Sequence, residues 1–196
     1  MRLIFNSIIF TITTFNFLLS ESIAPVARST KLPVMDGNVI DDEAWASINP
    51  IISFTQKSPD EGQVATEKTA VRIMYSDQMF YVSVICYDSN PKGIVISDTR
   101  RDAPLNNTDS FMFILDTFHD QQNGFVFGTN AGGIEYDAQV SGGGEGMSIS
   151  STRQSVGVGA NFNINWDAAW DVKTEIGEYG WSAEFAIPFK TLRFSS

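Results

Sequence analysis

The fold of this chain is decided by residues 109–137, which read DSFMFILDTFHDQQNGFVFGTNAGGIEYD. Apolar side chains recur at every second position here, and a period of two places them on one face of a strand. The residues that follow this pattern are Phe111, Phe113 and Leu115 before the first turn and Phe125 and Phe127 after it. Two polar connectors, residues 117–123 and 131–133, have the composition of hairpin loops. The stretch therefore predicts three antiparallel strands.

The rest of the chain adds two predicted hairpins and little helix. The first pairs Thr69–Tyr75 with Met79–Asp88, and the second pairs Ala168–Glu175 with Gly180–Ile187. The minor elements expected are one helical turn at Glu43-Ala44-Trp45, capped by Asp41 or Asp42, and short strands at Ile52–Gln56 and Ile94–Ser97. Eight or nine short strands predict an all-β, antiparallel, jelly-roll-like β-sandwich. Because the last residues do not complete a strand pattern, we expect a sandwich truncated before its last strand.

The first 22 residues have the pattern of an export signal, with Arg2 before a mostly apolar run and small residues near the end. A membrane anchor is the alternative, but the uninterrupted apolar runs are shorter than the ~20 residues of a spanning helix. We therefore expect a signal peptide (1–22), an N-terminal lead (23–32) and one sandwich domain (33–196). Cys86 is the single cysteine and lies on the apolar face of a predicted strand, which indicates a buried, unreactive thiol. An exported protein of this kind fits the periplasm, outer membrane or cell surface of a bacterium.

The charge of the chain restricts its partners. Its 23 acidic and 13 basic residues give a formal net charge of −10. The basic residues are dispersed and form no stripe that could neutralise phosphates, so we expect no nucleic acid partner. The same reasoning argues against direct binding to anionic lipid head groups. Neutral, hydroxyl-rich ligands and divalent cations remain compatible with an acidic surface.

Four groups of residues carry a resemblance to a known family. They are Met35-Asp36-Gly37 with Asp42-Glu43-Ala44-Trp45, Val71–Tyr75 with Phe80-Tyr81-Val82, Thr108-Asp109-Ser110 through Leu115-Asp116, and Trp181–Phe189. In this order and spacing they resemble the family 9 carbohydrate-binding modules (CBM9-like domains), over about residues 33 to 194. Thr99–Asp102 and Phe118-His119-Asp120 further resemble the variant at the N-terminus of large exported bacterial proteins with a predicted C-terminal outer-membrane β-barrel.

The resemblance implies a β-sandwich that binds carbohydrate, calcium in some members, and an association with glycoside-degrading enzymes and carbohydrate catabolism. It also implies that a downstream β-barrel of the same parent chain is a partner. Family members that bind sugar carry Trp, Glu and Arg where this chain has Asn106, Met112 and Gly128. We therefore do not expect the usual sugar contacts at these three positions.

The candidate carbohydrate contacts are Trp166 and Trp170, with Asn106, Arg100 and Arg101 on a neighbouring loop. Aromatic faces suit sugars because pyranose C–H groups form an apolar patch, while polar side chains fix the hydroxyls. The two tryptophans are four residues apart and could form a stacking platform. The alternative is that one or both pack in the core.

Two clusters of acidic residues suggest other chemistry. Asp116, Asp120 and Asn123 could bind calcium through hard oxygen ligands, or the acidic groups could cap their own turn. Glu135 and Asp137 would lie about 6.5–7 Å apart on one strand face, a spacing that fits glycoside hydrolysis with inversion. Such pairs are also common on solvated strand faces, so we expect no catalysis by this domain.

Three functional hypotheses follow. The first is a non-catalytic, carbohydrate-binding module of an exported cell-envelope protein, which holds a glycan or cell-surface polysaccharide near a partner domain. The second is a component of an enzyme that hydrolyses O-glycosyl bonds. The third is a structural or interaction domain that packs on the downstream barrel without a sugar ligand.

Overall fold

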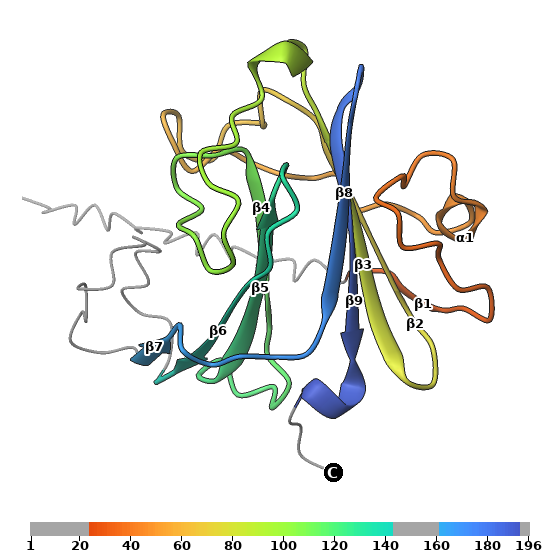
Figure 1. Ribbon diagram of the computed structural model, residues 1–196, viewed down its shortest axis with the longest axis vertical. Helices are drawn as coiled ribbons and strands as arrows, with labels where there is room; N and C mark the ends of the chain where they lie inside the picture. The colour runs from red at the N-terminus through yellow and green to blue at the C-terminus, as the bar shows by residue number, and fades with distance from the viewer. Residues whose placement is uncertain (1–23, 143–160, 193–196) are drawn as a thin grey trace, which may run out of the picture.

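The chain folds into two β-sheets that pack face to face, as the computed structural model shows for residues 24–142 and 161–192 (Figure 1). The predicted export signal and most of the Gly- and Ser-rich stretch after Ser141 lie outside these ranges. The two sheets share one core, which contains side chains from both. The predicted all-β sandwich is therefore confirmed.

The first sheet has five strands in the order β1-β2-β3-β9-β8. Its strands are β1 (Val26–Arg28), β2 (Thr69–Tyr75), β3 (Met79–Tyr87), β8 (Asp171–Gly177) and β9 (Gly180–Pro188). All neighbours pair antiparallel except β1, which runs parallel to β2. Both hairpins predicted for this sheet, β2–β3 and β8–β9, are confirmed with their central residues in the expected register.

The second sheet has four strands in the order β4-β5-β6-β7, all antiparallel. Its strands are β4 (Ser110–Leu115), β5 (Gly124–Asn130), β6 (Tyr136–Ser141) and β7 (Asn161–Asn163). The helical elements are α1 (Glu43–Ala46), η1 (Pro91–Gly93) and η2 (Phe189–Thr191). Asp42 caps α1 by accepting a hydrogen bond from the Ala44 amide at 2.7 Å. Within residues 24–142 and 161–192, no helix is long and apolar enough to cross a membrane.

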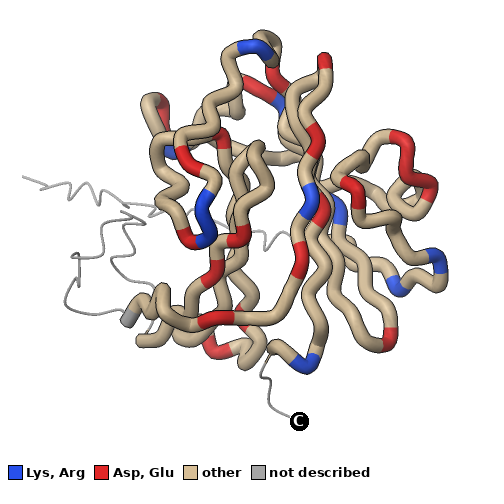
Figure 2. The backbone as a smooth tube through the Cα atoms, viewed as in Figure 1, with Lys and Arg blue, Asp and Glu red and all other residues tan. Residues whose placement is uncertain are grey.

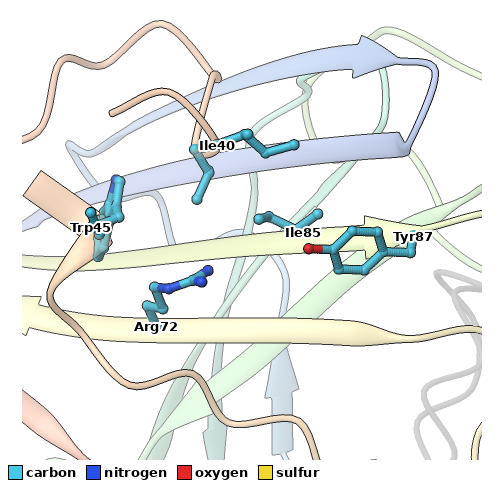
Figure 3. A pocket seen from close by; sticks show the side chains of 7 residues that line it. Ile40, Trp45, Arg72, Ile85 and Tyr87 are labelled. Carbon is cyan, nitrogen blue, oxygen red and sulfur yellow. The ribbon is translucent and has the colours of Figure 1, made fainter. Parts of the chain in front are cut away.

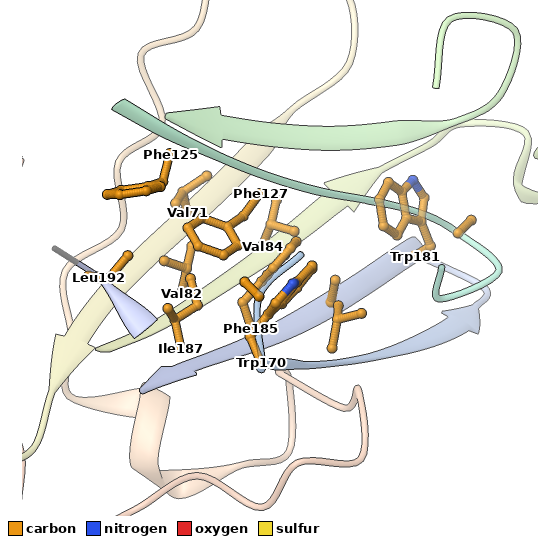
Figure 4. Close-up of a cluster of buried hydrophobic side chains, with 14 residues drawn as sticks. Val71, Val82, Val84, Phe125, Phe127, Trp170, Trp181, Phe185, Ile187 and Leu192 are labelled. Carbon is orange, nitrogen blue, oxygen red and sulfur yellow. The ribbon is translucent and has the colours of Figure 1, made fainter. Parts of the chain in front are cut away.

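The core between the sheets contains the side chains that the period of two placed inward. Phe125 and Phe127 of β5 are buried there, and Phe111, Phe113 and Leu115 of β4 pack against them. From the other sheet come Val82, Val84, Trp181, Ala183, Phe185 and Ile187, all buried (Figure 4). Cys86 is half-buried rather than fully buried; it packs against this core, and burial raises the pKa of its thiol to about 12.

The outer face of the five-stranded sheet is covered by the N-terminal segment that follows β1, residues 35–48 (Figure 1). The buried carboxylate of Glu184 on β9 holds this segment. It accepts hydrogen bonds from Trp45 Nε1 at 2.7 Å, from the Gly37 amide at 2.9 Å and from the Asp36 amide at 3.1 Å. We call this arrangement the Glu184 clasp. The groups of residues that carry the family resemblance include Asp36-Gly37, Trp45 and Glu184, and the clasp shows that these residues are structural partners.

The outer face of the four-stranded sheet is covered by residues 98–106. Ala103 and Leu105 are buried against Val126, Tyr136 and Ala138. This packing fixes the loop that carries Arg100 and Arg101, and it brings that loop over the start of β6.

Four details of the sequence prediction were wrong. Residues 52–56 and 94–97 form no strand; the first makes one isolated bridge, at Thr55, and the second bonds through Val95 to Asp109. Two short strands, β1 and β7, lie in stretches that were assigned to the N-terminal lead and to a loop. Each is a three-residue edge strand, which is too short for a period of two to reveal.

Candidate functional site

The candidate site is centred on the guanidinium of Arg101, which draws together carboxylates from separate segments. Its Nη2 atom donates to Asp137 Oδ2 and to Asp167 Oδ1, at 2.7 Å each. Its Nη1 atom donates to Glu135, and its Nε atom lies 3.7 Å from Asp102 Oδ2. Four carboxylates thus surround one cation. We call these five residues, together with Trp166 and Trp170, the Arg101 site.

Local backbone structure places Arg101 over the start of β6. The Asp102 amide donates to the Glu135 carbonyl at 3.0 Å, and Asp102 adopts a left-handed conformation with φ 57°. Aspartate tolerates this conformation better than most residues. The tight turn that results directs the Arg101 side chain toward the loop that leads into β8, where Asp167 lies.

Burial changes sharply across the site. The Asp137 side chain is only 1% exposed, whereas that of Asp167 is 80% exposed and that of Glu135 is 31% exposed. Asp137 Oδ2 also accepts a hydrogen bond from Trp170 Nε1 at 2.6 Å. Its other oxygen, Oδ1, is buried without a hydrogen-bond partner among the described residues. Asp137 therefore anchors the site to the core, and Glu135 and Asp167 form its accessible rim.

Burial also raises the pKa of Asp137 above its usual value of 3.8, although the Trp170 indole and the Arg101 charge lower it. The folded state therefore holds the proton more tightly than the unfolded state does. This contribution to stability is complete below about pH 3.8 and is lost as the pH rises through the folded pKa.

Replacing Asp137 by Asn should remove this pH dependence. As the pH rises from 3.8, we expect the unfolding free energy of the wild type to fall relative to that of Asp137→Asn. Urea unfolding at a series of pH values measures it. A wild type that becomes more stable relative to Asp137→Asn over the same pH interval would contradict the prediction.

The two candidate tryptophans lie differently. Trp170 is 7% exposed, and its indole stacks on Phe185 at 5.7 Å between ring centroids, deep in the core (Figure 4). Trp166 is only half-buried, and its ring lies 4.7 Å from that of Phe125. Trp170 therefore packs in the core, which was the alternative interpretation of the two tryptophans, and its ring face is closed to a ligand. Trp166 keeps part of its surface at the rim beside Asp167.

The other two candidate contacts, Arg100 and Asn106, lie on the loop that covers the four-stranded sheet. Arg100 is 82% exposed and is held by Asp98, at 2.6 Å between Nη2 and Oδ2. Asn106 is exposed on the same covering loop. Met112 and Gly128 face Leu105, and a Cβ atom on Gly128 would lie 2.8 Å from its Cδ1 atom. Apolar packing thus fills the positions where the family resemblance would place Glu and Arg.

The predicted calcium ligands instead cap their own loop. Asp116 accepts a hydrogen bond from the Gln121 amide at 2.8 Å, and Asp120 accepts from the Asn123 amide at 2.8 Å and from Asn123 Nδ2 at 2.7 Å. The bond from the Gln121 amide is the largest cause of the lowered pKa of Asp116. In the part of the chain that the structure describes, no three His, Cys, Asp or Glu side chains are arranged to hold a metal ion. The hydrogen bonds are those of an acidic turn, and calcium binding by Asp116, Asp120 and Asn123 stays a prediction.

Acid–base catalysis by Glu135 and Asp137 does not fit this geometry. Both carboxylates bind the same guanidinium, and Asp137 is buried beneath the Trp170 indole. No substrate can lie between them without breaking these bonds. The arrangement can bind and orient a ligand at its rim, and it lacks a pair of free carboxyl groups that flank an open site.

The charge distribution gives the site its context. Acidic positions are spread over most of the loops, and basic positions are few (Figure 2). The Arg101 site follows this pattern, since it carries four carboxylates and one guanidinium. A neutral ligand with hydroxyl donors fits it better than an anion does.

Comparisons with known proteins found a structural likeness. No protein-family model matches the chain, and a search of curated proteins found no match. Two solved structures are similar, both of a carbohydrate binding module family 9 (CBM9) from Caldicellulosiruptor kristjanssonii. The complex with glucose has 18% sequence identity and a TM-score of 0.44, and the complex with cellotriose has 17% and 0.48. Each likeness covers 83% of this chain, and 67% and 66% of the respective structures, about two-thirds of their length.

Proposed function

We propose that this chain is a non-catalytic carbohydrate-binding module and that its ligand contacts the rim of the Arg101 site. The observation that carries the proposal is the convergence of Glu135, Asp137 and Asp167 on one guanidinium beside the half-buried Trp166. Charged side chains preorganised by one another can contact a ligand without losing further side-chain entropy. The core supports this arrangement through Asp137 and Trp170.

The chemistry of the rim suits sugar hydroxyl groups. The oxygens of Asp167 and Glu135 can accept hydrogen bonds, and the guanidinium of Arg101, whose side chain is 38% exposed, can donate them. Asn163 and Asn165 are exposed next to Trp166 in sequence and add amide groups of both kinds. The accessible part of the Trp166 ring offers an apolar surface for pyranose C–H groups.

The wider setting is part of the same proposal. The pattern of residues 1–22 supports export, and an exported module with this rim would hold a glycan or cell-surface polysaccharide near a partner domain. Its place would be the periplasm, outer membrane or cell surface, and its role a part of carbohydrate binding and catabolism.

Binding to immobilised polysaccharides tests the proposal. We expect retention in affinity gels by at least one polysaccharide of a panel that includes cello-oligosaccharides and cell-surface glycans. Asp167→Asn and Trp166→Ala should each weaken it by about tenfold, because each removes one contact worth roughly 1–1.5 kcal/mol. Asp171→Asn changes another largely exposed aspartate, on β8; it is the matched control and should bind as the wild type does.

Two outcomes would reject this function. Absence of binding to every polysaccharide would favour an interaction domain that packs on a downstream domain of its parent chain, for which the exposed apolar side chains of Val34, Ile52 and Val64 are a specific argument. Release of reducing sugar by the purified chain, lost in Glu135→Gln, would instead show an enzyme that hydrolyses O-glycosyl bonds.

A further inference from the structure

A second candidate site lies on the outer face of the five-stranded sheet, under the N-terminal segment. Arg72 on β2, Ser83 on β3 and Glu184 on β9 are cross-strand neighbours in one row. Glu184 already accepts three N–H groups in the Glu184 clasp. The Glu184 carboxylate therefore bonds to the covering segment and does not pair with Arg72, the cation of the same row.

Arg72 is incompletely bonded within the protein. Its Nε atom donates to the Ile48 carbonyl at 3.2 Å, but its Nη1 atom is buried without a hydrogen-bond partner among residues 24–142 and 161–192. The neighbouring Ser83 Oγ is buried and unpartnered in the same sense. None of the ion pairs found in the described ranges includes Arg72. A guanidinium stays charged at all ordinary pH values, so a buried donor of this kind calls for an acceptor.

A hollow of about 170 Å³ opens directly at this guanidinium. Its walls come from three segments and are mostly apolar or aromatic: Val39, Ile40, Trp45, Ala46, Ile85 and Tyr87. The Arg72 guanidinium and the Tyr87 hydroxyl point toward one another across the hollow, with Ile85 between them (Figure 3). The volume is close to the ~150 Å³ of an engineered protein cavity that binds benzene. One small ring can therefore fit.

The charges around the hollow favour an anion more than the rest of the molecule does. Lys68 Nζ lies 5.2 Å from the centroid of the Tyr87 ring and adds a second cation. Asp41 and Asp42 keep their negative charges but do not pair with Arg72: Asp41 binds Asn38 Nδ2, and Asp42 accepts from the Val34 and Ala44 amides. The free cationic group at the hollow is thus Arg72, in a chain whose formal net charge is −10.

We propose that this hollow binds the carboxylate group of a small organic acid with an apolar or ring-shaped body. A guanidinium N–H group can donate a charge-assisted hydrogen bond to a carboxylate oxygen. Ile85, Trp45 and Tyr87 would cover the body of the acid, and the Tyr87 hydroxyl can donate a further hydrogen bond. The site is independent of the Arg101 site and of the function proposed for it, because it lies on the outer face of the other sheet.

Benzoate is a suitable probe, and benzamide is its neutral match in shape. We expect a titration followed by NMR to shift the methyl signals of Ile40 and Ile85, and benzoate to bind roughly ten- to hundredfold more tightly than benzamide, since a charge-assisted pair replaces a neutral one. Equal affinities, or the absence of methyl shifts at millimolar benzoate, would overturn the proposal.

Variants of Arg72 test whether the preference for benzoate depends on this side chain. Arg72→Gln should abolish the preference for benzoate over benzamide, while Arg72→Lys should keep part of it as a point charge. Arg28→Gln removes one charge from the exposed pair with Asp77 and should leave benzoate binding unchanged. If Arg28→Gln weakens binding as much as Arg72→Gln does, general electrostatics explains it and the proposal fails. If Arg72→Gln does not fold, the benzoate–benzamide comparison on the wild type and on Arg72→Lys decides.

Discussion

Replacing Gly37 by alanine is expected to lower the free energy of unfolding by about 3–5 kcal/mol, from the strain of its backbone and the lack of space around it together. Gly37 has a φ of +94°, a backbone conformation that residues with a Cβ atom rarely adopt. An added Cβ would lie 2.4 Å from the carbonyl carbon of Thr174 and 2.8 Å from the Glu175 amide nitrogen. Both belong to the backbone of β8, which cannot move without breaking its ladder to β9. Urea unfolding followed by tryptophan fluorescence measures the loss.

Gly62→Ala is the matched control. Gly62 has a similar φ of +81°, but no atom lies within 4 Å of its added Cβ. Only the backbone strain remains there, so we expect a loss of about 1–2 kcal/mol. Equal losses in the two variants would show that the close approach of Gly37 to β8 contributes nothing.

Replacing Glu184 by alanine should cost about 3–5 kcal/mol, because each buried donor left unsatisfied costs roughly 1–3 kcal/mol and the cavity adds to the loss. The substitution leaves Trp45 Nε1 and the amides of Asp36 and Gly37 without acceptors, and it opens a cavity under the N-terminal segment. Glu184→Gln keeps the shape of the side chain, but its NH₂ group would replace one of the two oxygens that accept from these N–H donors. We therefore expect a smaller loss than for alanine, about 2 kcal/mol. Unfolding in urea again provides the measurement.

The exposed glutamate of the β8–β9 turn, Glu178, controls for the loss of a negative charge. Glu178→Ala should change the unfolding free energy by no more than about 0.5 kcal/mol, as is usual for an exposed position. A loss below about 1 kcal/mol in Glu184→Ala would mean that the N-terminal segment docks through its apolar contacts alone.

The period of two predicted most of the fold because the sandwich buries one face of each long strand. It assigned Phe125, Phe127, Trp181 and Phe185 to the core correctly. The same pattern suggests that Ser83 and Glu184, on the opposite face, would meet solvent, yet both are fully buried. A cover formed by residues from the other end of the chain leaves no periodic signal in the strand that it covers.

The candidate site could be predicted only in part. The sequence pointed to Arg101 and to the two tryptophans, and the structure gathers them, but with Trp170 as a core support. The roles of Asp137 and Asp167 were missed, because their link to Arg101 joins residues 36 and 66 positions apart. The alternation of Tyr136, Ala138 and Val140 gave no signal of these roles, because it marks their face of β6 as buried and Asp137 as solvated, whereas both faces are covered.

The Glu184 clasp also determines when the domain can finish folding during synthesis. Trp45 and Asp36 depend on a carboxylate 139 and 148 positions further along the chain. At about 5–20 residues per second, β9 is made roughly 7–30 s after the segment that it anchors. During that interval Trp45 and Val39 lack the surface that buries them. Nascent chains of this protein should therefore be substrates for chaperones until the last hairpin emerges.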